Sequence, residues 1–167
     1  AADILLKYSG GTRQLEKFLH DLGFSGIDIR VNEKQMNQKA ENQYLNQAAP
    51  SDVAGLIKLV LEKDVLSAEH RKFLSHIMLK TSTGTDKIKQ GLPPGVMFGH
   101  KTGSSSRTAD GIKIADNDAG FVTLTNGRTY YIAVMITESK LDDRANAALA
   151  AQISQTVYNY LTTEKTD

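Results

Sequence analysis

Three adjacent residues, Lys101, Thr102 and Gly103, form the first group whose chemistry can be stated from the sequence. They stand at the end of a β-rich run, where a lysine ammonium and a threonine hydroxyl together offer hydrogen-bond donors to a carboxylate. Glycine has no side chain, so a ligand can lie against its backbone and bond to it as an added strand would. The segment predicts a site for a carboxylate-bearing ligand, although a strand that runs into a Gly/Ser turn has the same composition.

Glu33 and Asn37 form a second group, inside a polar segment that runs from about residue 24 to residue 50. A carboxylate and an amide four residues apart can hold a water molecule between them, as a general base requires. A solvated polar loop has the same residue types. A segment of this length without sustained periodicity is usually an Ω-loop or another functional loop. Lys87 is a third candidate, which alone indicates no more than a solvated charge.

The remaining elements follow from the spacing of apolar residues. Helices are expected up to Gly10, from Thr12 to Gly23, after Pro50, after Ser67 and over 145–161. From residue 96 the period becomes that of strands, with β-rich runs over 96–102, 119–124 and 129–137. A polar connection is expected over 104–117, and Asn126-Gly127 predicts a type I′ hairpin turn. The expected fold class is α+β: helical residues 1–80 with the long loop, then 81–167 with a three-stranded antiparallel sheet covered by a C-terminal helix.

Composition excludes several classes of function. Twenty Lys and Arg against nineteen Asp and Glu give a net charge of +1, which argues against a nucleic-acid partner. No apolar run approaches the roughly 18 residues of a membrane span. The chain has no Cys, and its four His lack ligand spacing, so we expect no metal and no cofactor.

Two features lead us to expect that the chain begins inside a larger fold. Its first residues, Ala1 to Tyr8, have the pattern of the middle of an amphipathic helix. The run Tyr130–Ile136 is strongly apolar, and an exposed strand edge of that kind promotes aggregation. We expect this edge to pair with strands outside the sequence.

Taken in order, these segments resemble the C-terminal part of a class A serine β-lactamase. The resemblance rests on residues along nearly the whole chain: Ala2-Asp3-Ile4-Leu5-Leu6 running to Gly10-Gly11, Leu15-x-x-Phe18-Leu19-x-x-Leu22-Gly23, Asn32-Glu33-x-x-x-Asn37, Thr83-Gly84, His100-Lys101-Thr102-Gly103, and the helix after Leu141. Of the three cleft motifs of the family, only Lys-Thr-Gly is present. No Ser-x-x-Lys or Ser-Asp-Asn occurs, so N-terminal strands and the nucleophile helix are expected to be missing.

The resemblance implies a role for each candidate residue. Glu33 looks like the base that activates the deacylating water, and Asn37 like its partner in holding that water. Lys101 and Thr102 resemble the pair that receives the substrate carboxylate. Ser104, after Gly103, resembles the position whose backbone N–H forms half of the oxyanion hole. Lys87 sits where some relatives place an arginine that reinforces carboxylate binding.

The implied function is hydrolysis of penicillins or cephalosporins through a serine acyl-enzyme, in the periplasm or outside the cell. A complementary N-terminal fragment would supply the nucleophile, and the isolated chain is expected to be inactive. The sequence departs from many relatives at two positions of the loop, where their Arg–Asp ion pair looks replaced by Val31 and Asn46. An extended-spectrum branch of the family shares this lack. We therefore expect hydrogen bonds to hold the loop. Two alternatives stay open: a penicillin-binding transpeptidase or carboxypeptidase, and an inert binding module.

Overall fold

The computed structural model describes residues 1–163 of the 167-residue chain. The helices, in chain order, are α1 (Ala2–Tyr8), α2 (Thr12–Asp21), α3 (Glu33–Met36), the 3-10 helix η1 (Ala40–Tyr44), α4 (Pro50–Glu62), α5 (Ala68–Leu79), the 3-10 helix η2 (Ile88–Gly91) and α6 (Asp143–Thr163). The strands are β1 (Ile27–Asp28), β2 (Gln47–Ala48), β3 (Met97–Ser104), β4 (Lys113–Thr123) and β5 (Thr129–Ser139). None of the helices in residues 1–163 has both the length and the apolar character needed to cross a membrane.

Contacts divide the chain into two compact units, Ala1–Leu56 and a second that starts at Ile57. The predicted division at residue 80 remains a prediction. In the first unit, the polar segment expected to be irregular contains α3 and η1, and its ends meet where β1 pairs antiparallel with β2. The pairing of Ile27 with Ala48 therefore closes the base of the segment that carries Glu33.

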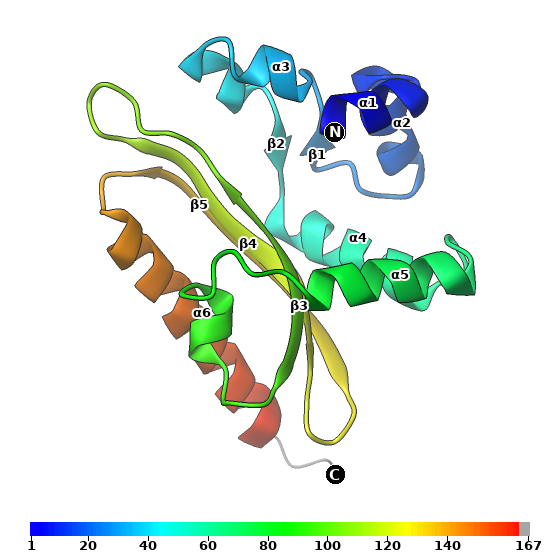
Figure 1. Cartoon of the computed structure of the whole chain (residues 1–167), viewed down its shortest axis with the longest axis vertical. Coiled ribbons are helices and arrows are strands. Elements are labelled where there is room, and N and C mark those ends of the chain that lie inside the picture. Colours follow the sequence, from blue (N-terminus) through cyan, green and yellow to red (C-terminus); the bar gives the residue numbers. More distant parts are fainter. Residues whose placement is uncertain (164–167) are drawn as a thin grey trace. The chain divides into compact units, whose positions relative to one another are not determined.

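The second unit is built on a sheet of order β3-β4-β5 with antiparallel pairing throughout. Figure 1 shows α6 running along one face of this sheet, and α5 contacts β3. Alternating apolar residues of the strands pack against α6 and η2 because successive side chains of a strand point to opposite faces. The resulting core consists of Ile88, Phe98, Val122, Leu124, Ile132, Val134, Ala150 and Tyr158. The predicted α+β fold, with three strands and a covering C-terminal helix, is confirmed.

Two details of the sheet differ from the prediction. Residues 113–117, expected in a polar connection, are the first half of β4, and the connection is confined to 105–112. The polar side chains of this half of β4 made it look like a loop in the sequence. They can lie in a strand because their charges are paired inside the protein. The type I′ turn is also wrong: Gly127 has a φ of 82°, whereas the φ of Asn126 is not positive. Instead, Gly127 N–H donates to the Leu124 carbonyl at 2.9 Å, which leaves glycine in the left-handed position of a longer loop.

Within the described residues, β5 is an edge strand with β4 as its partner. Its register places Tyr131 opposite Phe121 and Val134 opposite Asp118. The other edge of β5 has no strand beside it in this part of the chain. This is the edge for which the sequence predicts pairing with strands outside the chain.

Candidate functional site

Glu33 and Asn37 lie at the two ends of α3, in the first unit. Glu33 is the first residue of this helix and Asn37 is its C-cap. The Asn37 side-chain amide donates to the Glu33 carbonyl at 2.8 Å, and the same nitrogen lies 3.5 Å from Glu33 Oε1. The four-residue spacing seen in the sequence thus places an amide beside the carboxylate. Both side chains are exposed in this unit, which leaves room for a water molecule between or beside them.

Asp3 fixes the start of α3, which the sequence did not indicate. Its two carboxylate oxygens accept hydrogen bonds from the backbone N–H groups of Glu33 and Lys34, at 2.7 and 3.0 Å. Asn32 adds a capping box with Gln35, in which side chain and backbone satisfy each other in both directions. The helix end is therefore held from α1 and from within the loop, so the position of the Glu33 backbone is determined on both sides.

Asn46 holds the other side of the loop by hydrogen bonds alone. Its Oδ1 accepts from the backbone N–H groups of Arg30 and Val31 at 2.9 and 3.0 Å, and its Nδ2 donates to the Val31 carbonyl at 2.9 Å. Three hydrogen bonds of one side-chain amide thus connect residue 46 to residues 30 and 31. The expectation that hydrogen bonds hold the loop is confirmed.

Replacing Asn46 with alanine is expected to loosen this loop. Each lost hydrogen bond is worth about 1 kcal/mol, so local opening should become easier by about 1–3 kcal/mol. The measurement is amide hydrogen exchange, in which protection over residues 30–37 should fall about 10- to 100-fold. Asn46→Asp keeps the acceptor and should lie in between, whereas Gln38→Ala, at an exposed amide of the same loop, should leave protection unchanged.

A mainly apolar cavity of about 360 Å³ lies against Glu33 in the first unit. Asn32, Glu33 and Asn46 bring polar atoms to its wall. The apolar part of the lining comes from both helices before the loop and from the loop itself: Ala2, Leu5, Leu6, Leu15, Ile29, Val31 and Met36. Leu5 is 68% exposed although it belongs to the apolar face of α1. The carboxylate predicted to act as a base therefore stands beside an open apolar surface.

The Lys-Thr-Gly segment forms the last part of β3, in the second unit. Lys101 and Thr102 point to opposite faces of the sheet, since side chains alternate along a strand. The Lys101 ammonium is exposed and donates to the Thr102 carbonyl. Gly103 and Ser104 are exposed and pair with Asn117 and Asp116 of β4. The four predicted residues thus occupy one strand end, where three of them, Lys101, Thr102 and Ser104, carry polar side chains.

The predicted residue Lys87 lies beside this strand end. It is the N-cap of η2, and its ammonium donates to the Asp116 carboxylate of β4. The two side chains are 12% and 4% exposed, so this is a nearly buried ion pair. Thr83 Oγ1 lies 2.8 Å from Thr102 Oγ1, which links the turn before η2 to the same strand. The Lys87 ammonium is therefore fixed in an ion pair, whereas the sequence alone indicated a solvated charge.

Asp118, two residues after Asp116 in β4, is a second buried acid. It pairs with His100 of β3. Asp118 Oδ1 lies 2.8 Å from His100 Nδ1, and both side chains are at most 1% exposed. The imidazole also stacks on Phe98, with 4.4 Å between ring centroids. Sequence reasoning missed Asp116 and Asp118. The usable signal was the alternation of residues from 114 to 118, which predicts that both carboxylates face the same side.

The connection after β3 is anchored to the start of α6 by Arg107. Its guanidinium donates to the carbonyl oxygens of Gly111 and Leu141, each at 2.8 Å, and to Asp143 at 2.6 Å. The hydrogen bond from Arg107 holds the pKa of the Asp143 carboxyl below its ordinary value, and the charge of Lys113 acts in the same direction.

A pH dependence of stability follows from Asp143. A carboxyl whose pKa is lowered by folding stabilises the protein above its unfolded pKa, and this contribution is lost as the pH falls through the folded pKa. Asp143→Asn should therefore lower the melting temperature at about pH 7 and have little effect at about pH 2. Thermal melts at both pH values check this, with Asp110→Asn, an exposed position, as control. An equal effect of Asp143→Asn at the two pH values would exclude the proposed linkage.

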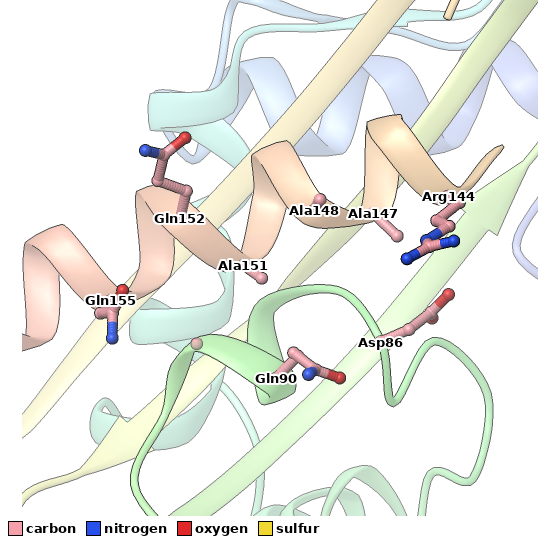
Figure 2. A pocket seen from close by; sticks show the side chains of 9 residues that line it. Asp86, Gln90, Arg144, Ala147, Ala148, Ala151, Gln152 and Gln155 are labelled. Atoms are coloured by element: carbon pink, nitrogen blue, oxygen red, sulfur yellow. The ribbon is translucent and has the colours of Figure 1, made fainter. Parts of the chain in front are cut away.

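A further cavity of the second unit, of about 450 Å³, lies between η2 and α6 (Figure 2). Asp86 and Arg144 stand at its rim, and Ala147, Ala148 and Ala151 form its alanine wall. Lys87 and Lys101 do not line it. This cavity is therefore distinct from the predicted carboxylate site.

Comparison with known proteins agrees with the observed fold. The model of a family described as "Beta-lactamase enzyme family" matches residues 1–161. A β-lactamase of Bacteroides uniformis is 41% identical over 160 residues, which cover 95% of this chain and 54% of that protein. The extended-spectrum β-lactamase PER-1 of Pseudomonas aeruginosa is 33% identical, with coverage of 96% and 52%. The crystal structure of a class A β-lactamase from Bacteroides cellulosilyticus is 44% identical and superposes with a TM-score of 0.92, over 97% of this chain and 58% of that one.

The chain thus spans about half the length of the relatives that it matches. The match extends through the loop with Glu33 and Asn37 and through the strand with Lys101 to Ser104. Family model, sequence relatives and superposed structure agree over nearly all of the described residues, and we conclude that the chain belongs to the β-lactamase enzyme family.

Proposed function

We propose that this chain supplies the water-activating and anion-binding half of the cleft of a class A serine β-lactamase. The segment between β1 and β2 would be the Ω-loop of that cleft, and β3 its substrate-binding strand. The observation that carries the proposal is the pairing of the Glu33 carboxylate with the Asn37 amide at 3.5 Å. A base in hydrogen-bond reach of a held water is what the hydrolysis of an acyl-enzyme requires.

In the proposed step, Glu33 accepts a proton from the water that Asn37 helps to hold. The water oxygen forms a bond to the acyl carbonyl carbon, and the ester bond to the serine oxygen breaks. The proton passes to the serine oxygen, so the hydroxyl is restored and the opened antibiotic leaves as an acid. The backbone N–H of Ser104 would stabilise the oxyanion that forms at the carbonyl.

The end of β3 supports the binding half of the proposal. A β-lactam carries a carboxylate, for which Lys101 offers a full charge and Thr102 a hydroxyl. The held ammonium of Lys87 reinforces the positive potential there. The bare edge at Gly103 lets the rest of the substrate lie along the strand.

The nucleophile must come from residues outside this sequence, since no Ser-x-x-Lys occurs in it. The apolar cavity beside Glu33 supports a partner segment with an apolar face, and the free edge of β5 supports added strands. The partner in this proposal is the complementary N-terminal part of the same enzyme. The substrates are penicillins and cephalosporins, with cephalosporins favoured by the loop that Asn46 holds, and the location is periplasmic or secreted.

The proposal is tested in a chimera in which this chain replaces the matching region of the Bacteroides uniformis β-lactamase. Incubation with benzylpenicillin followed by intact mass measurement should show a penicilloyl adduct that disappears within seconds. A penicillin-binding transpeptidase would keep its adduct for hours. A folded chimera that forms no adduct would contradict the proposed binding site, and a persistent adduct would contradict the proposed role of Glu33.

A further inference from the structure

We infer that Asp116 is a positioning residue that fixes the ammonium of Lys87 beside Thr102, at the anion-binding end of β3. This inference rests on the proposed function, because the anion is the carboxylate of the proposed substrate. It assigns a role to an acidic residue in a place where an anion is to be bound. An uncompensated acid there would weaken the binding, so the presence of Asp116 calls for a specific reason.

The Lys87–Asp116 ion pair is nearly buried. A lysine at a surface normally keeps its ammonium in water and leaves only its methylenes packed. The Lys87 side chain is instead nearly buried, and its ammonium donates to the still more buried Asp116. Without the carboxylate, the ammonium would gain hydration by turning outward. The geometry therefore makes Asp116 the group that keeps Lys87 inside.

The side chains of Lys87 and Thr102 lie close to each other. At Gly84, where φ is 63°, an added Cβ would lie 2.5 Å from Thr102 Cγ2 and 3.4 Å from Lys87 Cδ. The two side chains therefore share the space beside one glycine. In the β3–β4 register, Thr102 pairs with Asp118 and Ser104 pairs with Asp116, so Thr102 and Asp116 project on the same face. Lys101 projects on the other face.

The consequence is a strand end flanked by two cations with different properties. Lys101 is exposed, whereas Lys87 is nearly buried and held by Asp116. An ammonium has three N–H donors, and the bond to Asp116 uses one of them. The others keep a defined direction as long as the first bond holds. Asp116 thus lowers the positive charge of the site, but it also fixes the direction of the remaining N–H donors of Lys87.

The closing experiment is a double-mutant cycle in the chimera with a cephalosporin as substrate. Asp116→Ala should raise KM about 10-fold and change kcat less than about twofold, because one charge-assisted hydrogen bond is lost in binding. In a Lys87→Ala background the same change should raise KM less than about twofold, since Asp116 acts through Lys87. Asp116→Asn retains an acceptor oxygen and should restore KM to within about threefold of the starting protein. Equal effects in both backgrounds, or tighter binding by Asp116→Asn, would overturn the inference.

A second measurement separates this inference from the proposed function. In the full chain with ¹⁵N-labelled lysine, the Lys87 ammonium should give a slowly exchanging signal that shifts on titration with acetate. The signal should persist in Asp116→Asn and vanish in Asp116→Ala. If it shifts while the chimera hydrolyses no β-lactam, the proposed function fails and the anion site stands. If acetate leaves it unmoved, or if Asp116→Ala preserves it, the positioning role is refuted.

Discussion

Glu33→Ala in the chimera is expected to stop turnover at the acyl-enzyme. General-base catalysis by a positioned side chain contributes about 10²- to 10⁴-fold, so deacylation should slow by that factor. Acylation by benzylpenicillin should still yield one adduct per molecule, because the serine lies outside the changed position. Intact mass measurement at intervals of seconds to hours follows the adduct, which should now outlast the experiment.

Two control variants bracket this result. Glu41→Gln changes an exposed glutamate of the same loop and should leave the adduct as short-lived as in the starting chimera. Asn37→Ala removes the amide beside the carboxylate and should slow deacylation less than Glu33→Ala does, since the base itself remains. Normal turnover in Glu33→Ala would mean that another group activates the water, and the assignment of Glu33 would be wrong.

Lys87→Met is expected to destabilise the chimera by about 3–5 kcal/mol, the usual cost of leaving one partner of a buried ion pair alone. Asp116 is 4% exposed and would be left buried without its partner. Urea denaturation provides the measurement, with the midpoint shifting at an unchanged slope.

The matched control for this prediction is Lys89→Met, two residues along η2, where the side chain is exposed and the change should be within about 0.5 kcal/mol. Lys87→Met combined with Asp116→Leu should recover most of the loss, because removing both charges leaves none unpaired. A small effect of Lys87→Met alone would show that the two groups do not depend on each other.

The sequence predicted the regular elements where one pattern dominated. The four-residue recurrence from Ala145 to Leu161 predicted α6, and the β-rich run over 129–137 predicted β5. Prediction failed where polar residues serve a buried structure. Asp116 and Asp118 look like loop residues in the sequence, because the partners that allow their burial, Lys87 and His100, are 29 and 18 residues away.

The same distinction applies to the candidate site. The relation of Glu33 to Asn37 is local, so a spacing of four residues was sufficient to predict it. Asp3 caps α3 from thirty residues away, and a local sequence pattern cannot predict a contact over that separation. The hairpin turn failed for a different reason: the Asn126 side chain accepts from Arg128 N–H at 3.0 Å and favours a conformation other than the left-handed one that a type I′ turn needs.

The most direct test of the account is the hydrolysis of a chromogenic cephalosporin by the chain alone and by the chimera. We predict no hydrolysis by the chain, because it lacks a Ser-x-x-Lys nucleophile, and multiple turnovers by the chimera that Glu33→Ala abolishes. Turnover by the purified chain alone would contradict the account, as would a chimera that is folded by circular dichroism and hydrolyses nothing.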